Sequence, residues 1–454
     1  FVSHNSKNWI ALQNGTNKDP DDNPTYWKEQ TIYEIVTPYV EADLADLKFT
    51  QSADTLYIVH PDYAPRKLER LAHDNWTLSL FPFVNGPFML TNTGTTTLAV
   101  SAVTGTSKTL TASAATFDAL QIGGLFRLDH NISGQSVITD FNGDASSSSI
   151  KVSGTWRIIT HGTWNGTLKI EKSTDGGSTW TELRCFSSFN NFNANTYGTD
   201  EEYCLIRATM SSYVGAPGGT GAYNAATAYI IDQWCIDGGV AYRCVAVDSS
   251  GECKAKTPAT SPAYWQAKTC RVELSSDPFT QKGIVKITAV ASSTSATVDV
   301  LTEVGSTSAT TDWAEGSWSA LRGYPSSVIF YQDRLVFAGS VYEPQTLWFS
   351  MTGSYADFGR SDPLVDSDGI SINLPSRKMN GIKNMIGLGE ILAFTSATEW
   401  SIGPSQSGII TPTSIDTKVQ GYRGSNGVTP LVIGNRVIFI QPMGSVLSDF
   451  VYDY

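Results

Sequence analysis

A unit of two short strands recurs four times along the chain, and it constrains the fold more than any other feature. Each copy has a polar turn, a strand that alternates or is entirely apolar, a loop rich in Gly, Pro or Ser, and a second strand. This turn chemistry and period predict hairpins. The first strands span 53–60, 332–339, 389–396 and 434–441, and the second strands follow at 66–70, 345–350, 399–402 and 445–450.

The spacing of the copies predicts the architecture. The polar turns at positions 334, 390 and 436 lie 56 and 46 residues apart, whereas the first copy lies far upstream. Repeats of about 40–50 residues with two to four strands are typical of β-propeller blades, because one blade cannot bury both of its faces. We expect an all-β chain, an interrupted β-propeller-like domain with inserted β-sandwich or β-barrel domains. The alternative is a β-rich protein whose hairpins only look alike.

Changes in pattern along the chain suggest domain boundaries. Glu41–Leu47, which follows Pro38, is the best candidate for a short helix.

The chain begins at Phe1 without Met and stops in strand-like sequence at Tyr454, so we interpret it as a fragment. The expected domains are an N-terminal platform with the first propeller segment (1–85), a small all-β insertion (86–154), an inserted β-sandwich or fin (155–217 and 271–320), a carbohydrate-binding-like module (218–270) and the remaining, C-terminally incomplete blades (321–454).

Charge and composition exclude several functions. Charged residues are 16% of the chain and the net charge is −12. A protein that grips phosphates is normally basic, so the sequence argues against tight nucleic-acid binding. An acidic wall would instead let DNA pass without holding it. No apolar run is long enough to span a membrane.

The sequence predicts no cofactor, no metal site and no catalytic centre. The six cysteines form no CxxC pair and the five histidines are scattered, which argues against zinc. The cysteines are interpreted as buried thiols, with a local disulfide among the four at 235–270 as the alternative. Asp19, Asp21 and Asp22 lie in a Pro/Asn-rich stretch and are interpreted as a solvated loop.

The segment Ser173–Trp180 matches the Asp-box pattern SxDxGxTW. In this pattern the Asp accepts backbone hydrogen bonds in a tight turn, the Gly takes an unusual backbone conformation, and the Trp packs beneath the hairpin. Sialidases repeat the box as a structural element, and here it occurs once. We therefore predict a structural turn, formed by Ser173, Asp175, Gly177 and Trp180.

Aromatic residues from Ala222 to Gln266 resemble the small chitin-binding modules of chitinases, which follow an aromatic–Y–G–V–x–G–x–Y–W order. In that family exposed aromatics stack on sugar rings. The resemblance implies possible glycan or partner contact by Trp234, Tyr242 and Trp265. The pair Trp234-Cys235 departs from the family pattern, and a packed mini-core is the alternative interpretation.

A series of short segments, in a fixed order, covers both ends of the chain. They are Thr37-Pro38-Tyr39, Glu41–Leu44, Gln51–Asp54, His60-Pro61, Trp313–Ser319, Arg322–Pro325, Arg334–Gly339, Trp348–Ser350, Gly353–Phe358 and Thr398–Trp400. Together they resemble the tail tubular protein B, or nozzle, family of short-tailed phages. The chitin-binding-like module is an addition not expected in every member.

This resemblance implies a structural subunit of a phage tail, present in the virion and assembled in the host cytoplasm. Nozzle proteins form a hexameric tube below a tail adaptor ring, beside tail fibres or spikes, and phage DNA leaves through the lumen. Its implied partners are therefore copies of itself, the adaptor, the fibres or spikes, and passing DNA without specific binding. Two alternatives stay open: a glycan-cleaving tail enzyme, and a host-recognition protein that binds surface glycan without cleaving it.

Overall fold

The computed structural model describes residues 2–451 except 6, 31–33, 73–74, 189–192, 218, 362–363, 376–379, 407 and 435. Every long element in this part of the chain is a β-strand, and the helices it contains are three 3-10 turns, η1 (Glu41–Asp43), η2 (Ala119–Gln121) and η3 (Pro258–Thr260). The all-β expectation is therefore confirmed. Among the described residues, no helix is long and apolar enough to cross a membrane.

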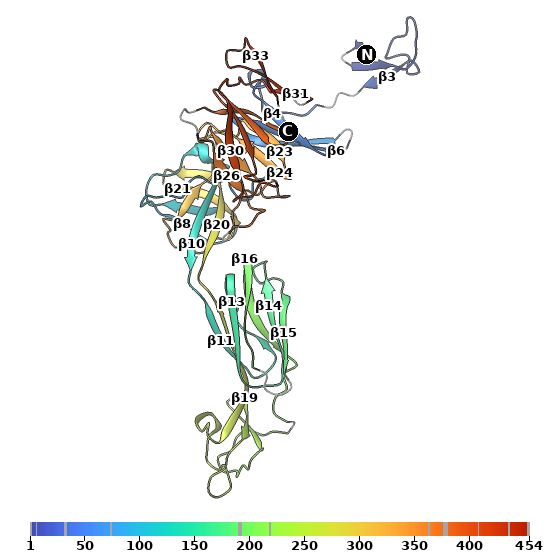
Figure 1. Cartoon of the computed structure of the whole chain (residues 1–454). Coiled ribbons are helices and arrows are strands. Elements are labelled where there is room, and N and C mark those ends of the chain that lie inside the picture. Colours follow the sequence, from blue (N-terminus) through green and yellow to red (C-terminus); the bar gives the residue numbers. More distant parts are fainter. Residues whose placement is uncertain are drawn as a thin grey trace.

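Four small antiparallel sheets stack at the end of the molecule that is uppermost in Figure 1. The first sheet has β4 (Lys48–Ser52), β5 (Thr55–His60), β6 (Tyr63–Ala72) and β7 (Asn75–Leu80). The second has β23 (Ser327–Tyr331), β24 (Arg334–Ala338), β25 (Thr346–Phe349) and β26 (Ile370–Asn373). The third has β27 (Ile382–Gly387), β28 (Ile391–Thr395), β29 (Glu399–Gly403) and β30 (Asp416–Gly421). The fourth has β31 (Leu431–Ile433), β32 (Arg436–Ile440) and β33 (Leu447–Val451).

The recurring sequence unit is the second and third strand of each small sheet. Asn435, in the turn of the last copy, lies outside the described residues. Leu335 and Phe337 of β24 enter the core between the first and second sheets. Val336 and Ala338 point the other way, into the core between the second and third sheets. After Arg334 the strand is apolar, because both of its faces are buried.

A six-stranded sheet lies below the stack (Figure 1). Its strand order is β22 (Trp313–Glu315), β10 (Leu125–Ile132), β20 (Phe279–Ser292), β21 (Ser295–Thr302), β9 (Lys108–Ala112) and β8 (Leu98–Val100). A β-bridge joins Leu98 to Thr310, just before β22. This bridge brings the two ends of the sheet together, so the sheet curls around its own apolar core.

A nine-stranded sheet follows, farther from the stack. Its main path is β15 (Thr181–Ser188), β14 (Gly166–Ser173), β16 (Asn195–Ser211), β13 (Ile150–Thr163), β19 (Trp265–Ser276), β18 (Val240–Cys244) and β17 (Trp234–Asp237). In addition, β11 (Ser136–Phe141) pairs with β19, and β12 (Ala145–Ser146) pairs with β16.

The two large sheets are connected by a pair of antiparallel chain segments. Ile132 pairs with Phe279 at the end of the six-stranded sheet, and Ser136 pairs with Ser275 at the start of the nine-stranded sheet. The chain therefore leaves and re-enters through the same narrow connection. We call residues 133–278 the fin.

Two small units complete the elongated molecule (Figure 1). The tip module consists of residues 219–264, inserted between β16 and β19, and the first residues of β19, 265–268, which pair with β18; it lies at the far end of the fin. The N-terminal arm, residues 2–30, contains a three-stranded sheet of β1 (Val2–His4), β2 (Lys7–Ala11) and β3 (Trp27–Gln30) and projects sideways from the stack.

Strand pairing divides the insertion differently from the boundaries expected at 154/155 and 270/271. Residues 279–302 complete the six-stranded sheet with β8, β9 and β10, whereas residues 136–154 belong to the fin. The strands of the fin belong to one connected sheet that encloses a buried core, with a register shift between Val152 and Gly154 of β13. Alternation along a strand shows which residues face a core, but it does not show which strands are neighbours. The helix expected at Glu41–Leu47 is limited to the single 3-10 turn η1.

Candidate functional site

The core of the tip module is aromatic. Trp265 is only 2% exposed, and its indole Nε1 donates a hydrogen bond to the carbonyl oxygen of Lys256 at 2.7 Å. Tyr229 and Tyr223 contact its ring edge to face, at centroid distances of 5.1 and 6.2 Å. A ring enclosed in this way cannot stack on a sugar, so the contact role considered for Trp265 is wrong. Its aromatic character stabilises the module instead.

Tyr242 also belongs mainly to this interior. It is half-buried and packs against the cluster that contains Trp265 and the thiols of Cys235, Cys244 and Cys253. Burial raises the pKa of Tyr242 above its ordinary value. All six cysteines of the chain are free thiols, and burial raises the pKa of Cys235 to about 12. Cys235, Cys244 and Cys253 form a packed mini-core with Tyr229 and Trp265, and Tyr242 packs against it.

Trp234 lies on the opposite face of the same strands. It pairs directly with Arg243 of β18, and Arg243 pairs directly with Gln266 of β19. Because directly opposed residues share a face, these three side chains lie side by side and point away from Trp265. All three are partly exposed. We call this set of three the tip face.

Polar contacts hold the tip face in position. The Nη2 of Arg243 donates to Oε1 of Gln266 at 3.5 Å, and its Nη1 lies 3.6 Å from the Asp232 carboxylate. The buried ammonium of Lys268 lies 5.4 Å from the Trp234 ring centroid. Burial lowers the pKa of Lys268. The sequence pattern included Trp234 but missed Arg243 and Gln266, which only the period of two along paired strands could have indicated.

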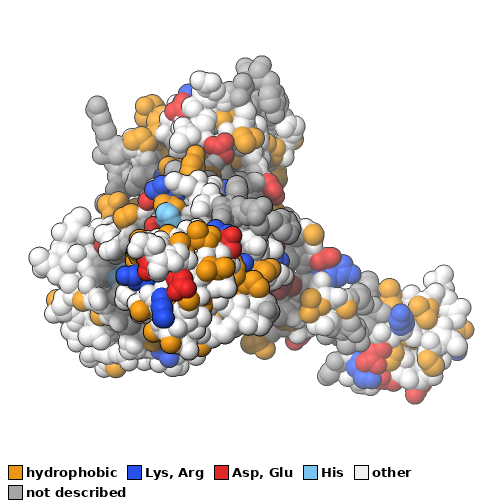
Figure 2. Space-filling view, turned by 90° about the horizontal axis from the view of Figure 1, so that it is seen from below, with side chains coloured by type: hydrophobic (Ala, Val, Ile, Leu, Met, Phe, Trp, Pro, Cys, Tyr) orange, Lys and Arg blue, Asp and Glu red, His pale blue; other side chains and the backbone are white. Residues whose placement is uncertain are grey.

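The tip face has the chemistry of a shallow carbohydrate or polar-peptide contact. An indole offers an apolar face, a guanidinium offers several donors, and an amide offers both a donor and an acceptor. The surface at this end carries Lys, Arg, Asp and Glu side chains interspersed with hydrophobic ones (Figure 2).

The Asp-box residues meet in the turn between β14 and β15. The Asp175 carboxylate accepts hydrogen bonds from the Thr179 backbone N–H at 2.9 Å and from the Thr179 hydroxyl at 2.6 Å. Ser173 donates to Asp175 at 2.7 Å and accepts from the Gly177 N–H at 2.8 Å. The bonds from Thr179 hold the pKa of Asp175 far below its ordinary value of 3.8. The indole of Trp180 donates to the Gly177 carbonyl at 2.9 Å, which closes the turn.

The Asp-box turn also faces the joint between the fin and the rest of the molecule. Thr174 and Gly176 line a polar cavity of about 390 Å³ together with Lys282 and Arg360. Beside it, the Lys151 ammonium forms an ion pair with Glu303 at 3.0 Å across the joint. The Tyr203 hydroxyl of β16 donates to the same Glu303 carboxylate at 3.3 Å, so polar contacts from two strands hold the base of the fin.

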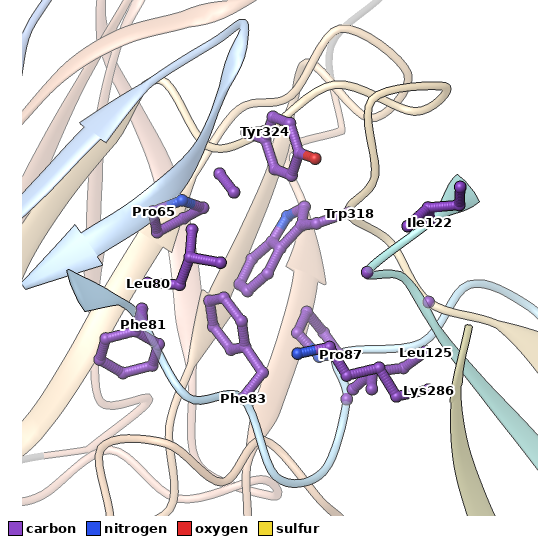
Figure 3. Close-up of a pocket in the computed structure, with 14 residues that line it drawn as sticks. Pro65, Leu80, Phe81, Phe83, Pro87, Ile122, Leu125, Lys286, Trp318 and Tyr324 are labelled. Atoms are coloured by element: carbon purple, nitrogen blue, oxygen red, sulfur yellow. The ribbon is translucent and has the colours of Figure 1, made fainter. Parts of the chain in front are cut away.

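A second, apolar cavity lies between the first small sheet and the six-stranded sheet (Figure 3). It measures about 140 Å³, and Leu80, Phe83, Trp318 and Tyr324 line it. Lys286 is the one charged residue in this lining. The lining brings no nucleophile or pair of carboxylates together, and its chemistry is that of a packed joint between two sheets.

No protein-family model matches the chain, and a search of curated proteins finds no significant match.

Proposed function

We propose that this chain is a structural subunit of the tail nozzle of a short-tailed phage, a tail tubular protein B, and not an enzyme. The observation that carries the proposal is the nested architecture. One stack of small sheets is interrupted after its first member, and the interruption contains a six-stranded sheet, a fin and a tip module in succession (Figure 1). A stack that forms a wall, with appended domains projecting from it, suits a tube subunit better than a single-site enzyme.

The stacked sheets form an interrupted β-propeller-like wall in this proposal. The inner strands β24 and β28 are buried on both faces, and each sheet joins sequential strands in antiparallel order. The outer face of the fourth sheet exposes apolar residues, for example Leu431, which is 60% exposed, and Ile433, which is 54% exposed. Contact with further β-structure would remove these side chains from water.

The proposed assembly is a cyclic homo-oligomer, a hexamer by family resemblance, in the virion tail. It contacts the tail adaptor ring and the tail fibres or spikes. In a closed ring every subunit uses two different surfaces, one toward each neighbour. The net charge of −12 supports a lumen through which DNA slides without specific binding.

Electron microscopy of tails that contain this chain tests the proposal. We expect a closed ring with a central channel, with fins and tip modules projecting outward. Mass photometry of the isolated ring gives the number of subunits. A single copy per tail, or a ring without a channel, would contradict the proposal.

A second candidate is a host-recognition tail protein that binds surface glycan, and the tip face favours it. Here Trp234 would stack on a sugar ring while Arg243 and Gln266 bind its hydroxyls. Titration with chito-oligosaccharides compares the full chain with Trp234→Ala and with Trp76→Ala, an exposed indole on β7. Binding that only Trp234→Ala removes supports this role. No binding at millimolar ligand rejects it, and release of reducing sugar would indicate a glycan-cleaving enzyme.

A further inference from the structure

Few side chains of the N-terminal arm are buried. Among the residues of 2–30 whose burial is described, Trp9 and Pro20 are the buried ones. A small sheet with so little buried apolar surface is commonly stabilised by a disulfide, a metal ion or association with another chain. Residues 2–30 contain no cysteine.

Three side chains that commonly bind metals converge in this arm. The Nε2 of His4, at the end of β1, lies 3.1 Å from Oδ1 of Asp19 and 3.4 Å from Oδ2 of Asp21. Among the described residues, this is the one group of three or more such side chains whose donor atoms all lie within 4.8 Å of one another. Two donors bound at about 2.1 Å to one tetrahedral ion stand roughly 3.4 Å apart. The two distances from His4 Nε2 are close to this value, and the two carboxylate oxygens lie within 4.8 Å of each other.

Local hydrogen bonds hold the two carboxylates in place. Asp19 Oδ1 accepts the backbone N–H of Asp21 at 3.0 Å, which forms a tight turn around Pro20. The Asn23 amide donates to the Asp19 carbonyl at 2.9 Å, and the Trp27 indole donates to the Lys18 carbonyl at 2.9 Å. These bonds join the loop 12–26 to the start of β3, and both carboxylates face His4.

A fourth side chain lies against the same donor atoms. The Nδ2 of Asn5 is 2.6 Å from Asp21 Oδ2 and 3.2 Å from His4 Nε2. A flip of the Asn5 side-chain amide would exchange its Nδ2 and Oδ1, so that Oδ1 would lie beside His4 and Asp21 as an additional oxygen ligand. An ion pair between His4 and the carboxylates is the competing explanation, but exposed ion pairs contribute little to stability.

We propose that His4, Asp19 and Asp21 bind a divalent transition-metal ion, with zinc as the best fit. A neutral imidazole and two carboxylates carry two negative charges, which a divalent cation neutralises, and this donor set suits zinc. Water or Asn5 completes the coordination. The ion ties the loop 12–26 to β1 and thereby stabilises the arm, where few side chains are buried. Figure 2 shows Asp, Glu, Lys and Arg side chains gathered on this projecting arm.

Zinc titration of the chelator-treated full chain tests the site by calorimetry. We expect one zinc ion per chain in the wild type, and loss of that ion in both His4→Gln and Asp19→Asn. Asp22→Asn is the matched control, because Asp22 lies in the same loop outside the cluster. His161→Gln is a second control, because His161 is exposed and lies 3.4 Å from Glu273.

Two further measurements identify the ligands and the effect. X-ray absorption of the zinc complex should show only nitrogen and oxygen neighbours, which excludes binding by the cysteines. Zinc should also slow proteolysis within the arm of the wild type and of Asp22→Asn, but not of His4→Gln. Unchanged zinc binding by His4→Gln, a sulfur ligand, or no binding at millimolar zinc would each overturn the proposal.

Discussion

Trp265 and Tyr229 meet edge to face in the centre of the tip module, with their ring centroids 5.1 Å apart. This contact places Trp265 in the core, whereas the sequence motif did not distinguish aromatic residues of the core from those on the surface. Trp265 stabilises the module from within, whereas Trp234, on the same small sheet, faces outward. An aromatic motif that resembles a sugar-binding module therefore contains one residue available for contact and one that is not.

Substitution Trp265→Ala should unfold the tip module. Removing a buried indole costs about 3–5 kcal/mol, more than a module of this size can lose. Hydrogen exchange across 219–264 should become fast, while the six-stranded sheet keeps its protection. Trp234→Ala is the control and should leave exchange in the module nearly unchanged. Equal protection in Trp265→Ala and wild type would contradict the assignment of Trp265 to the core.

The Asp-box turn should stabilise the fin in a pH-dependent manner. The pKa of Asp175 is lowered in the folded chain, so its contribution is present above the ordinary value of 3.8 and is lost as the pH falls below it. Asp175→Asn should therefore lower the melting temperature of the fin near neutral pH. The difference from wild type should shrink in acid, as measured by calorimetry.

A substitution on the neighbouring strand tests whether the effect of Asp175→Asn on the melting temperature comes from the turn or from the loss of any carboxylate charge. Glu182→Gln removes a carboxylate on β15 that forms an exposed ion pair with Lys169 at 2.9 Å. It should change the melting temperature little at any pH, because exposed ion pairs contribute little. A pH dependence equal to that of Asp175→Asn would show that the turn has no special role.

The buried guanidinium of Arg334 should be important for the stack of small sheets. It is 2% exposed and donates to the backbone carbonyls of Ser350 at 2.7 Å, Asp366 at 2.6 Å and Asp368. Arg334→Met would leave these carbonyls without their donors, at a cost of roughly 3 kcal/mol. Denaturant unfolding monitored in the stack should show this loss.

Arg436 provides the matched comparison for Arg334. It occupies the corresponding first position of β32, but it is exposed and pairs with Asp449 at 2.8 Å. Arg436→Met should therefore shift the unfolding midpoint far less than Arg334→Met. Similar shifts for both variants would mean that the hydrogen bonds of Arg334 add nothing to stability.

Thiol labelling should distinguish one cysteine from the other five. Cys185 is exposed and the others are buried. Burial raises the pKa of Cys204 to about 11 and that of Cys270 to about 12, which suppresses their reactive thiolates. Mass spectrometry after alkylation should find one label on the native chain and six after denaturation. Fewer than six labels on the denatured, unreduced chain would indicate the local disulfide that the spacing also allowed.

The sequence predicted the fold class and much of the local structure. The recurring unit corresponds to the second and third strands of each small sheet, because turn chemistry and strand period are local properties. The run at 335–338 is wholly apolar, and the structure shows a strand that is buried on both faces. The Asp-box pattern predicted a turn for the same reason, since Asp175 and Thr179 are neighbours in the chain.

Tertiary structure alone decided which segments meet. The pairing of residues 279–302 with β9 and β10 brings together strands far apart in the sequence, so no local pattern could set the domain boundary. One step along β19 separates Gln266, on the tip face, from Trp265, in the core, and the register with β18 determines which is which. Likewise, His4 and Asp19 lie together only because the arm folds back on itself. Residue types and the period of apolar residues determine where strands form. Long-range pairing determines which strands are neighbours, and therefore which side chains come together in a site.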